Sequence, residues 1–175
     1  GGDRWSTSSG SLSAITAIDG SQFFGAQDID GTCGSSAGES LTFDNVSVNG
    51  FTGVEISFQY YVIGYDNGDD VDYEVFIDGV GQGVVSLIAG GTGGVSSGGW
   101  QTETIVIGTA TTVGIRLDAD QNGGSDYAGF DNFQVTGTAG SPDPVVGFDI
   151  TSSSIAEGNS GTTVHTVDVT MDIAP

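Results

Sequence analysis

Apolar and polar residues alternate with a period of two along several segments of this chain, and this pattern limits the fold more than any other feature. A β-strand sends successive side chains to opposite faces, so a period of two predicts strands with one face on a core. The clearest case is VEISFQYYVIGY, residues 54–65. Similar patterns predict strands at 21–31, 40–48, 71–79, 103–108, 112–120 and 128–137.

Turn-forming segments separate these predicted strands, and no window of helical length carries an apolar stripe at helical spacing. The sequence therefore predicts an all-β chain: an antiparallel β-sandwich of jelly-roll type, plus a short two-strand C-terminal segment. In the strand at 128–137, strict alternation places Phe130 and Asn132 on one face and Phe133 and Val135 on the other.

The residue composition and pattern change after residue 138. Residues 1–138 are predicted to form the sandwich, and residues 139–144 a linker of small residues and proline. Residues 145–175 hold two predicted strands, which are too few for a core of their own. We expect this segment to be either part of a second domain or a tail that donates strands to another subunit, allowing self-association through the C-terminal strands.

The charge of the chain excludes several classes of partner. It has 23 acidic residues against two arginines, giving a formal net charge of −21. Binding to the phosphate backbone of nucleic acids requires a basic surface, so no nucleic acid is expected as a partner. Attraction to an anionic membrane is disfavoured for the same reason, and no apolar run reaches the length of a membrane span.

The sequence offers little for catalysis. His165 is the lone histidine and Cys33 the lone cysteine, and they are far apart in the sequence. No nucleophile can be matched with a positioned base, so the chain is predicted not to be an enzyme. The same scarcity of nitrogen and sulfur ligands argues against zinc and iron.

Closely spaced acids predict calcium, because Ca²⁺ requires six to eight oxygen ligands converging on one point. The acids and amides fall into three groups along the chain. The candidate ligands are Asp28 and Asp30; Asp66, Asp69 and Asp70; and Asp118, Asp120, Asn122 and Asp126. The competing explanation for each group is a solvated turn, because Asp, Asn and Gly are also the commonest turn residues.

Four segments taken in order resemble a jelly-roll module found in large bacterial secreted and surface proteins. They are GSQFFGAQDIDG, SLTFDNVSVNGFTGVEISFQYYV, DNGDDVDYEVFIDG and SDYAGFDNFQVTG, and the resemblance covers residues 10–138. It implies a secreted, extracellular or cell-surface location. It also implies that Asp28, Asp30 and Asp131 converge on one calcium ion, although Asp131 could instead cap a turn or bond a backbone NH.

A second resemblance concerns the tail. Residues 157–162, EGNSGT, resemble a turn of Calx-beta domains, which are calcium-associated β-sandwiches. The resemblance implies that Glu157 is a calcium ligand, and that residues 145–175 are the N-terminal part of such a domain.

Two functions fit these features. The first is a calcium-stabilised structural or adhesive module of a large secreted or cell-surface bacterial protein, an extracellular filament subunit among the options. The alternative is a carbohydrate-binding module accessory to a secreted hydrolase, in which exposed rings stack on a glycan. The candidate rings are Trp5, Trp100, Tyr61, Tyr65 and Tyr127. The alternative for each ring is packing in the core, which is the commoner fate of a Trp or Tyr.

Overall fold

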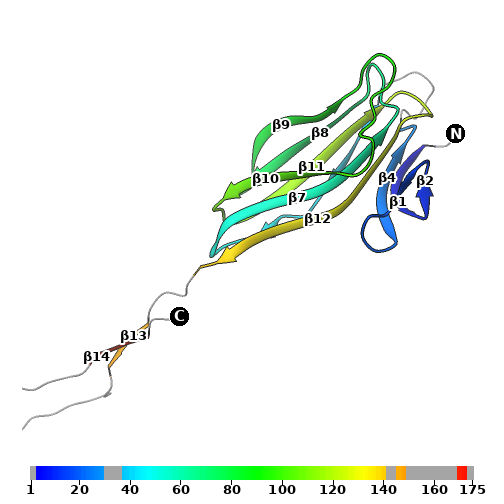
Figure 1. The fold of residues 1–175 in the computed structure, drawn as a ribbon. Coiled ribbons are helices and arrows are strands. Elements are labelled where there is room, and N and C mark those ends of the chain that lie inside the picture. The colour runs from blue at the N-terminus through cyan, green and yellow to red at the C-terminus, as the bar shows by residue number, and fades with distance from the viewer. Residues whose placement is uncertain (1–2, 30–36, 141–144, 149–168, 173–175) are drawn as a thin grey trace, which may run out of the picture. The chain divides into compact units, whose positions relative to one another are not determined.

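The computed structural model describes residues 3–29, 37–140, 145–148 and 169–172. Every regular element in these residues is a strand, so the predicted all-β class is confirmed (Figure 1). Among the same residues there is no helix long and apolar enough to cross a membrane. The chain divides into two compact units, Gly1–Ala139 and Gly140–Pro175.

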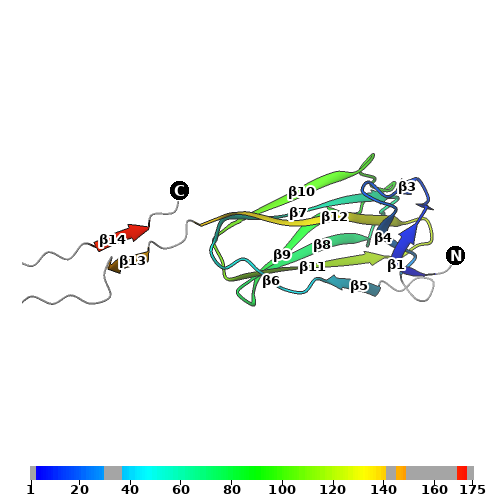
Figure 2. The ribbon, with the colours of Figure 1, turned by 90° about the horizontal axis from the view of Figure 1, so that it is seen from below.

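The first unit is an antiparallel β-sandwich of two main sheets, which Figure 2 shows as two layers. In the layer that we call the β12 sheet, the strand order is β1 (Arg4–Ser9), β4 (Gln22–Gln27), β12 (Tyr127–Ala139), β7 (Phe51–Ile63) and β10 (Gln101–Gly108). In the other layer, the β11 sheet, the order is β5 (Ala37–Thr42), β11 (Thr112–Gln121), β8 (Asp70–Ile77) and β9 (Val80–Ala89), and β6 (Val46–Ser47) also pairs with β11.

The predicted strands agree with the observed ones where alternation is regular. Segment 54–65 lies almost entirely in β7, and 112–120 lies in β11. Segment 40–48 is two strands rather than one, β5 and β6. Strand β9 was missed, because its glycines and its mostly exposed side chains give no period of two.

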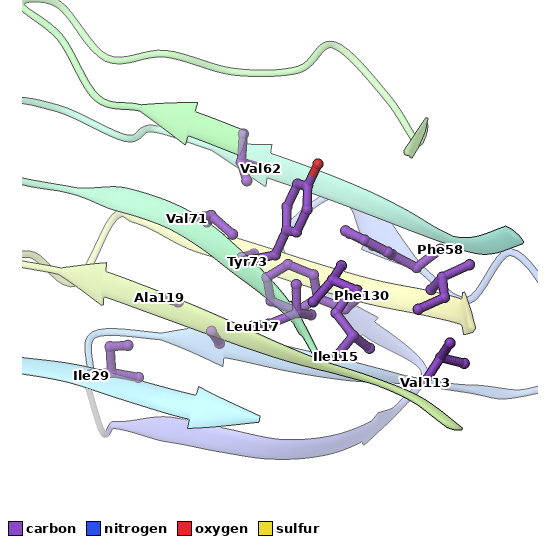
Figure 3. Close-up of a cluster of buried hydrophobic side chains, with 14 of the residues drawn as sticks. Ile29, Phe58, Val62, Val71, Tyr73, Val113, Ile115, Leu117, Ala119 and Phe130 are labelled. Carbon is purple, nitrogen blue, oxygen red and sulfur yellow. The ribbon is translucent and has the colours of Figure 1, made fainter. Parts of the chain in front are cut away.

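The main core lies between the two sheets. Figure 3 shows side chains of both sheets, including Phe58 of β7 and Leu117 of β11, in the shared interior. Val54, Ile56, Phe58 and Val62 are buried on one face of β7, as the alternation predicts. Burial of these apolar faces is the main force that holds the layers together.

A bulge in β12 corrects one predicted face. The register against β7 shifts between Asp131 and Gln134, and Asn132 adopts a left-handed φ of 54°. Phe130 is buried in the core, and Phe133 also packs inward, stacked on Phe58 with ring centroids 5.2 Å apart. The prediction that these two phenylalanines face opposite ways is therefore wrong, because the extra residue of a bulge changes the alternation.

A small hairpin, β2 (Ser11–Leu12) and β3 (Ile15–Thr16), packs with Phe23 in a second apolar cluster. Its close approach to the β12 sheet depends on two paired glycines, Gly25 of β4 and Gly129 of β12. A Cβ added at Gly129 would lie 2.7 Å from Ile15 Cγ2, and one at Gly25 2.9 Å from Leu12 Cδ2. Glycine at both positions therefore leaves the space that the hairpin fills.

The second unit is described over two strands, β13 (Val145–Phe148) and β14 (Val169–Asp172). They pair antiparallel, with Val145 opposite Asp172. This is the short two-strand C-terminal segment that the alternation predicts.

Candidate functional site

The connections that follow β7 and β11 meet through contacts between their polar groups, and the end of β4 joins them through Gln27. Both connections come from the acid-rich segments of the sequence. The Asn122 amide donates hydrogen bonds to the Asn67 carbonyl (3.0 Å) and to Asp66 Oδ1 (3.4 Å), and Gln27 Nε2 donates to the Gly124 carbonyl (3.3 Å). We call Asp28, Asp66, Asp69, Asn122 and Asp126 the acidic loop cluster.

Asp69 ties two of these loops together. Its side chain is buried, and its carboxylate accepts hydrogen bonds from the backbone NH of Asp66 (2.6 Å) and of Asn122 (2.9 Å). Burial raises the pKa of Asp69, and these two hydrogen bonds oppose the rise. Since both carboxylate oxygens already accept a backbone NH, Asp69 positions the cluster.

Among the acids of the cluster, Asp126 has the most strongly raised pKa, so the fold favours its neutral form most. It is 3% exposed, and its carboxylate lies close to the backbones of Gly64 and Gly123. The pKa of Asp126 is raised to about 6, chiefly by burial and then by the charges of Asp69, Asp66 and Asp28, while a hydrogen bond from the Gly123 backbone opposes the rise. A bound cation would remove this cost by stabilising the carboxylate form.

The cations of the sandwich are engaged elsewhere. Arg116 pairs with Glu74 (3.2 Å) and with Asp118 (2.8 Å), and Arg4 donates a hydrogen bond to Ser8 (2.7 Å). The ion pairs that the described residues form both involve Arg116, so none of them neutralises the acidic loop cluster.

The acidic loop cluster has the kind of ligand atoms that calcium prefers, but its side chains do not converge on one point. Its side chains offer only oxygen ligands apart from the Asn122 amide nitrogen, as Ca²⁺ prefers. As placed, however, no three acidic, histidine or cysteine side chains in the described part of the chain converge as a metal site requires. Binding would therefore require side-chain rotation around Asp126.

The candidate acids of β8 and β11 lie on paired strands. Asp70 of β8 stands opposite Asp120 of β11, and Asp72 stands opposite Asp118. Arg116 and the Ser40 hydroxyl both bond Asp118. Burial, followed by neighbouring carboxylates, raises the pKa of Asp70 and of Asp120, and Asp120 Oδ1 is buried without a hydrogen-bond partner.

Asp131 has a structural role in the fold. Its carboxylate accepts hydrogen bonds from the backbone NH groups of Ile18 (3.0 Å), Asp19 (3.4 Å) and Asn132 (2.8 Å). The pairing of β4 with β12 sets Gln27 opposite Tyr127 and Phe24 opposite Phe130, so Asp28 and Asp131 are separated along the strands rather than brought together. Asp30 and Glu157 fall outside the described residues, as do Cys33 and His165.

The candidate sugar-binding rings divide into two kinds. Tyr65 is 0% exposed, so the prediction that it offers an exposed ring is wrong. Trp5 packs against the main core and edge-on against Phe24, with ring centroids 4.8 Å apart. Trp100 and Tyr127 are half-buried beside the second apolar cluster.

One buried polar pair was missed from the sequence. Gln121 is fully buried, and its amide donates a hydrogen bond of 2.9 Å to the hydroxyl of Tyr65, while its Oε1 has no hydrogen-bond partner. The pKa of Tyr65 is raised, chiefly by burial and also by the charges of Asp69 and Asp126. Extending the alternation of 112–120 by one residue would have placed Gln121 on the inward face with Leu117 and Ala119.

No protein-family model matches this sequence, and no curated protein matches it. Among solved structures, TmCBM61 in complex with beta-1,4-galactotriose shows 13% identity, with a TM-score of 0.49 over 70% of this chain and 74% of that one. A family 16 carbohydrate-binding module shows 12% identity, with a TM-score of 0.38 over 69% and 80%. The K3 cleaved adhesin domain of Lys-gingipain from Porphyromonas gingivalis shows 11% identity, with a TM-score of 0.41 over 70% and 78%. These similarities assign no site.

Proposed function

We propose that this chain is a non-catalytic β-sandwich module of a secreted or cell-surface protein, with a structural or adhesive role, and that its acidic loop cluster binds calcium. The observation that carries the proposal is the buried carboxylate of Asp126, which Asp69, Asp66 and Asp28 surround with like charge. A buried carboxylate requires a partner, and the ion pairs of the described residues leave none here.

The proposed roles within the cluster differ. Asp126, Asp66 and Asp28 supply ligand oxygens, and Asp69 holds the loops through its two backbone hydrogen bonds. Calcium fits better than magnesium, because it accepts irregular sets of oxygen ligands while magnesium requires near-ideal octahedral geometry. By linking loops that follow β7 and β11, the ion would stiffen one end of the sandwich.

Thermal unfolding tests this proposal. An ion that binds only the folded chain raises the unfolding midpoint with the logarithm of its concentration. We expect calcium to raise the midpoint relative to EDTA, magnesium to raise it much less, and the D126N variant to lose most of the calcium response. The matched control is D44N, which removes the same charge from an exposed residue outside the cluster and should keep the response.

Two outcomes would overturn the calcium site. Equal midpoint shifts with calcium and magnesium at matched ionic strength would show screening of surface charge alone. Equal calcium responses in D126N and D44N would place the ion somewhere other than the acidic loop cluster.

Glycan binding is the second candidate, and a specific patch favours it. Trp100 and Tyr61 make an edge-to-face contact with centroids 6.0 Å apart, and Tyr127 belongs to the same cluster. Half-exposed rings of this kind can stack on the apolar face of a sugar. On a glycan array, Y127A should lose any binding that F51A, an exposed ring outside the patch, retains.

A further inference from the structure

One side of the sandwich carries its most exposed apolar side chains. The four most exposed large apolar residues in the described part of the chain are Val106, Val80, Val84 and Val85, at 72%, 63%, 58% and 46%. Three of them lie on β9 and one on β10. These two strands are the end strands of their respective sheets.

An apolar groove opens between the same two strands. It has a volume of about 250 Å³, and residues of β8, β9 and β10 line it, among them Tyr73, Val85 and Ile105. Interior side chains of both sheets therefore reach the surface here. Natural sheet edges are normally protected by lysine, proline, charged side chains, β-bulges or a covering segment. The pairing of β9 with β8 is bulged at two places, but β9 contains no lysine, no proline and no charged residue.

This side is also almost free of charge in a chain of net charge −21. Between residues 79 and 115 the one charged residue is Glu103, whose carboxylate accepts a hydrogen bond of 3.0 Å from the Tyr73 hydroxyl. The acidic face of the β11 sheet begins one strand away, on β8, with Asp70, Asp72 and Glu74. Two copies of this chain can therefore approach each other through β9 with little direct repulsion.

We propose that β9 is the contact surface for a second copy of this chain, the two β9 strands pairing antiparallel about a two-fold axis. A symmetric pairing of this kind uses the same surface twice and closes on itself. It satisfies the free backbone groups of both edges and covers the exposed valines and the adjoining groove.

The spacing of strands gives the expected dependence on salt. In such a dimer, the acids of β8 and those of the partner's β8 are separated by three strand spacings, about 14 Å. This exceeds the Debye length of about 8 Å at physiological ionic strength, so their repulsion is largely screened there and grows at low salt. The dimer should therefore weaken as salt is removed. Its formation does not rest on calcium, so the tests below are made in EDTA.

Sedimentation equilibrium of the full chain tests the proposal. We expect a monomer–dimer equilibrium at physiological salt, and at least a tenfold higher dissociation constant in V84K, corresponding to about 1.4 kcal/mol. In the monomer the new lysine stands opposite Glu74, so it forms a favourable cross-strand pair and the fold is retained. The substitution lowers the net negative charge, so a loss of dimer could not come from added overall repulsion.

The matched control is V46K. Val46 is 44% exposed, and it lies on β6 beside β11, outside the β9 and β10 strands. This variant makes the same change of charge and should dimerise like the unmodified chain. V80K is a second test at the start of β9, in case V84K does not fold.

Two results would overturn the proposal. One is a chain that stays monomeric at physiological salt up to the highest concentration reached. The other is a dimer that V84K, V80K and V46K leave equally intact, or one whose formation does not slow hydrogen exchange of the β9 amides.

Discussion

At the scale of single residues, Asp126 makes the stability of the chain depend on pH. Its pKa is about 6 in the fold, above the ordinary value of 3.8, so the folded state binds this proton more tightly than the unfolded state. Without calcium, this residue therefore makes unfolding cost more as pH falls through about 6, and the gain is lost again as pH rises.

We expect the free energy of unfolding in EDTA to rise between about pH 7 and pH 5, with a contribution from Asp126 of about 1.3 kcal/mol over this range. D126N should remove this contribution and flatten the curve. Urea denaturation at the two pH values measures it. Asp69, Asp70 and Asp120 also have raised pKa values and leave a residual slope in the variant. An unchanged slope in D126N would contradict the assignment.

The sequence identified the acids of this cluster but not their individual roles. Residue types and spacing indicated Asp66, Asp69, Asn122 and Asp126, because closely spaced oxygen ligands in turns are typical of calcium sites. The sequence does not reveal that the Asp69 carboxylate accepts a hydrogen bond from the Asn122 backbone NH, because the two residues are 53 positions apart. Tyr65 shows the same limit, because its burial depends on contacts with Val95 and Gln121.

At the scale of elements, the bulge in β12 can be tested by substitution. Asn132 combines a φ of 54° with a side-chain hydrogen bond of 3.1 Å to Gln59 Oε1. A β-branched residue strongly disfavours that backbone conformation. N132V should therefore destabilise the fold by about 2 kcal/mol, while N132G, which relieves the strain and loses only the side-chain hydrogen bonds with Gln59 and Gln134, should cost about 1 kcal/mol.

Urea denaturation of both variants measures this difference. Equal losses in the two would mean that the side-chain hydrogen bonds with Gln59 and Gln134, rather than the backbone conformation, account for the effect. The bulge itself could not be predicted from the alternation, because one extra residue leaves no mark in an apolar pattern. Strands β7, β8 and β11 were predictable for the opposite reason, since each keeps an unbroken period of two.

At the scale of the whole molecule, the net charge of −21 opposes the compact state, because folding brings the acids closer together. Salt screens this repulsion. Raising sodium chloride from low to physiological concentration in EDTA should therefore raise the unfolding midpoint by roughly 2 to 8 °C, the shift that about 1 kcal/mol gives in a domain of this size. Calorimetry measures it, and a midpoint that stays constant or falls would contradict the expected self-repulsion.

The sequence predicted the class of the whole molecule but not the order of its strands. Period-two patterns and glycine-rich turns were enough for an antiparallel sandwich. The resemblance to jelly-roll modules implied that the segments around Asp28 and Asp131 lie close together, but the alternation could not give the pairing of β4 with β12, because that pairing depends on the fit of Gly25 and Gly129 beneath the β2–β3 hairpin. Such a fit is a property of the assembled sheet rather than of either segment.

The pairing of β4 with β12 also determines when the β12 sheet can form during synthesis of the chain. Gly25 and Gly129 are about 100 residues apart, and ribosomes add roughly 5 to 20 residues per second. Strand β4 must therefore wait roughly 5 to 20 seconds for β12 to be synthesised, with the edge of β4 that pairs with β12 open meanwhile. Of the two main sheets, the β12 sheet is completed second, so the emerging chain depends on keeping the open edge of β4 from pairing with other chains until β12 has been made.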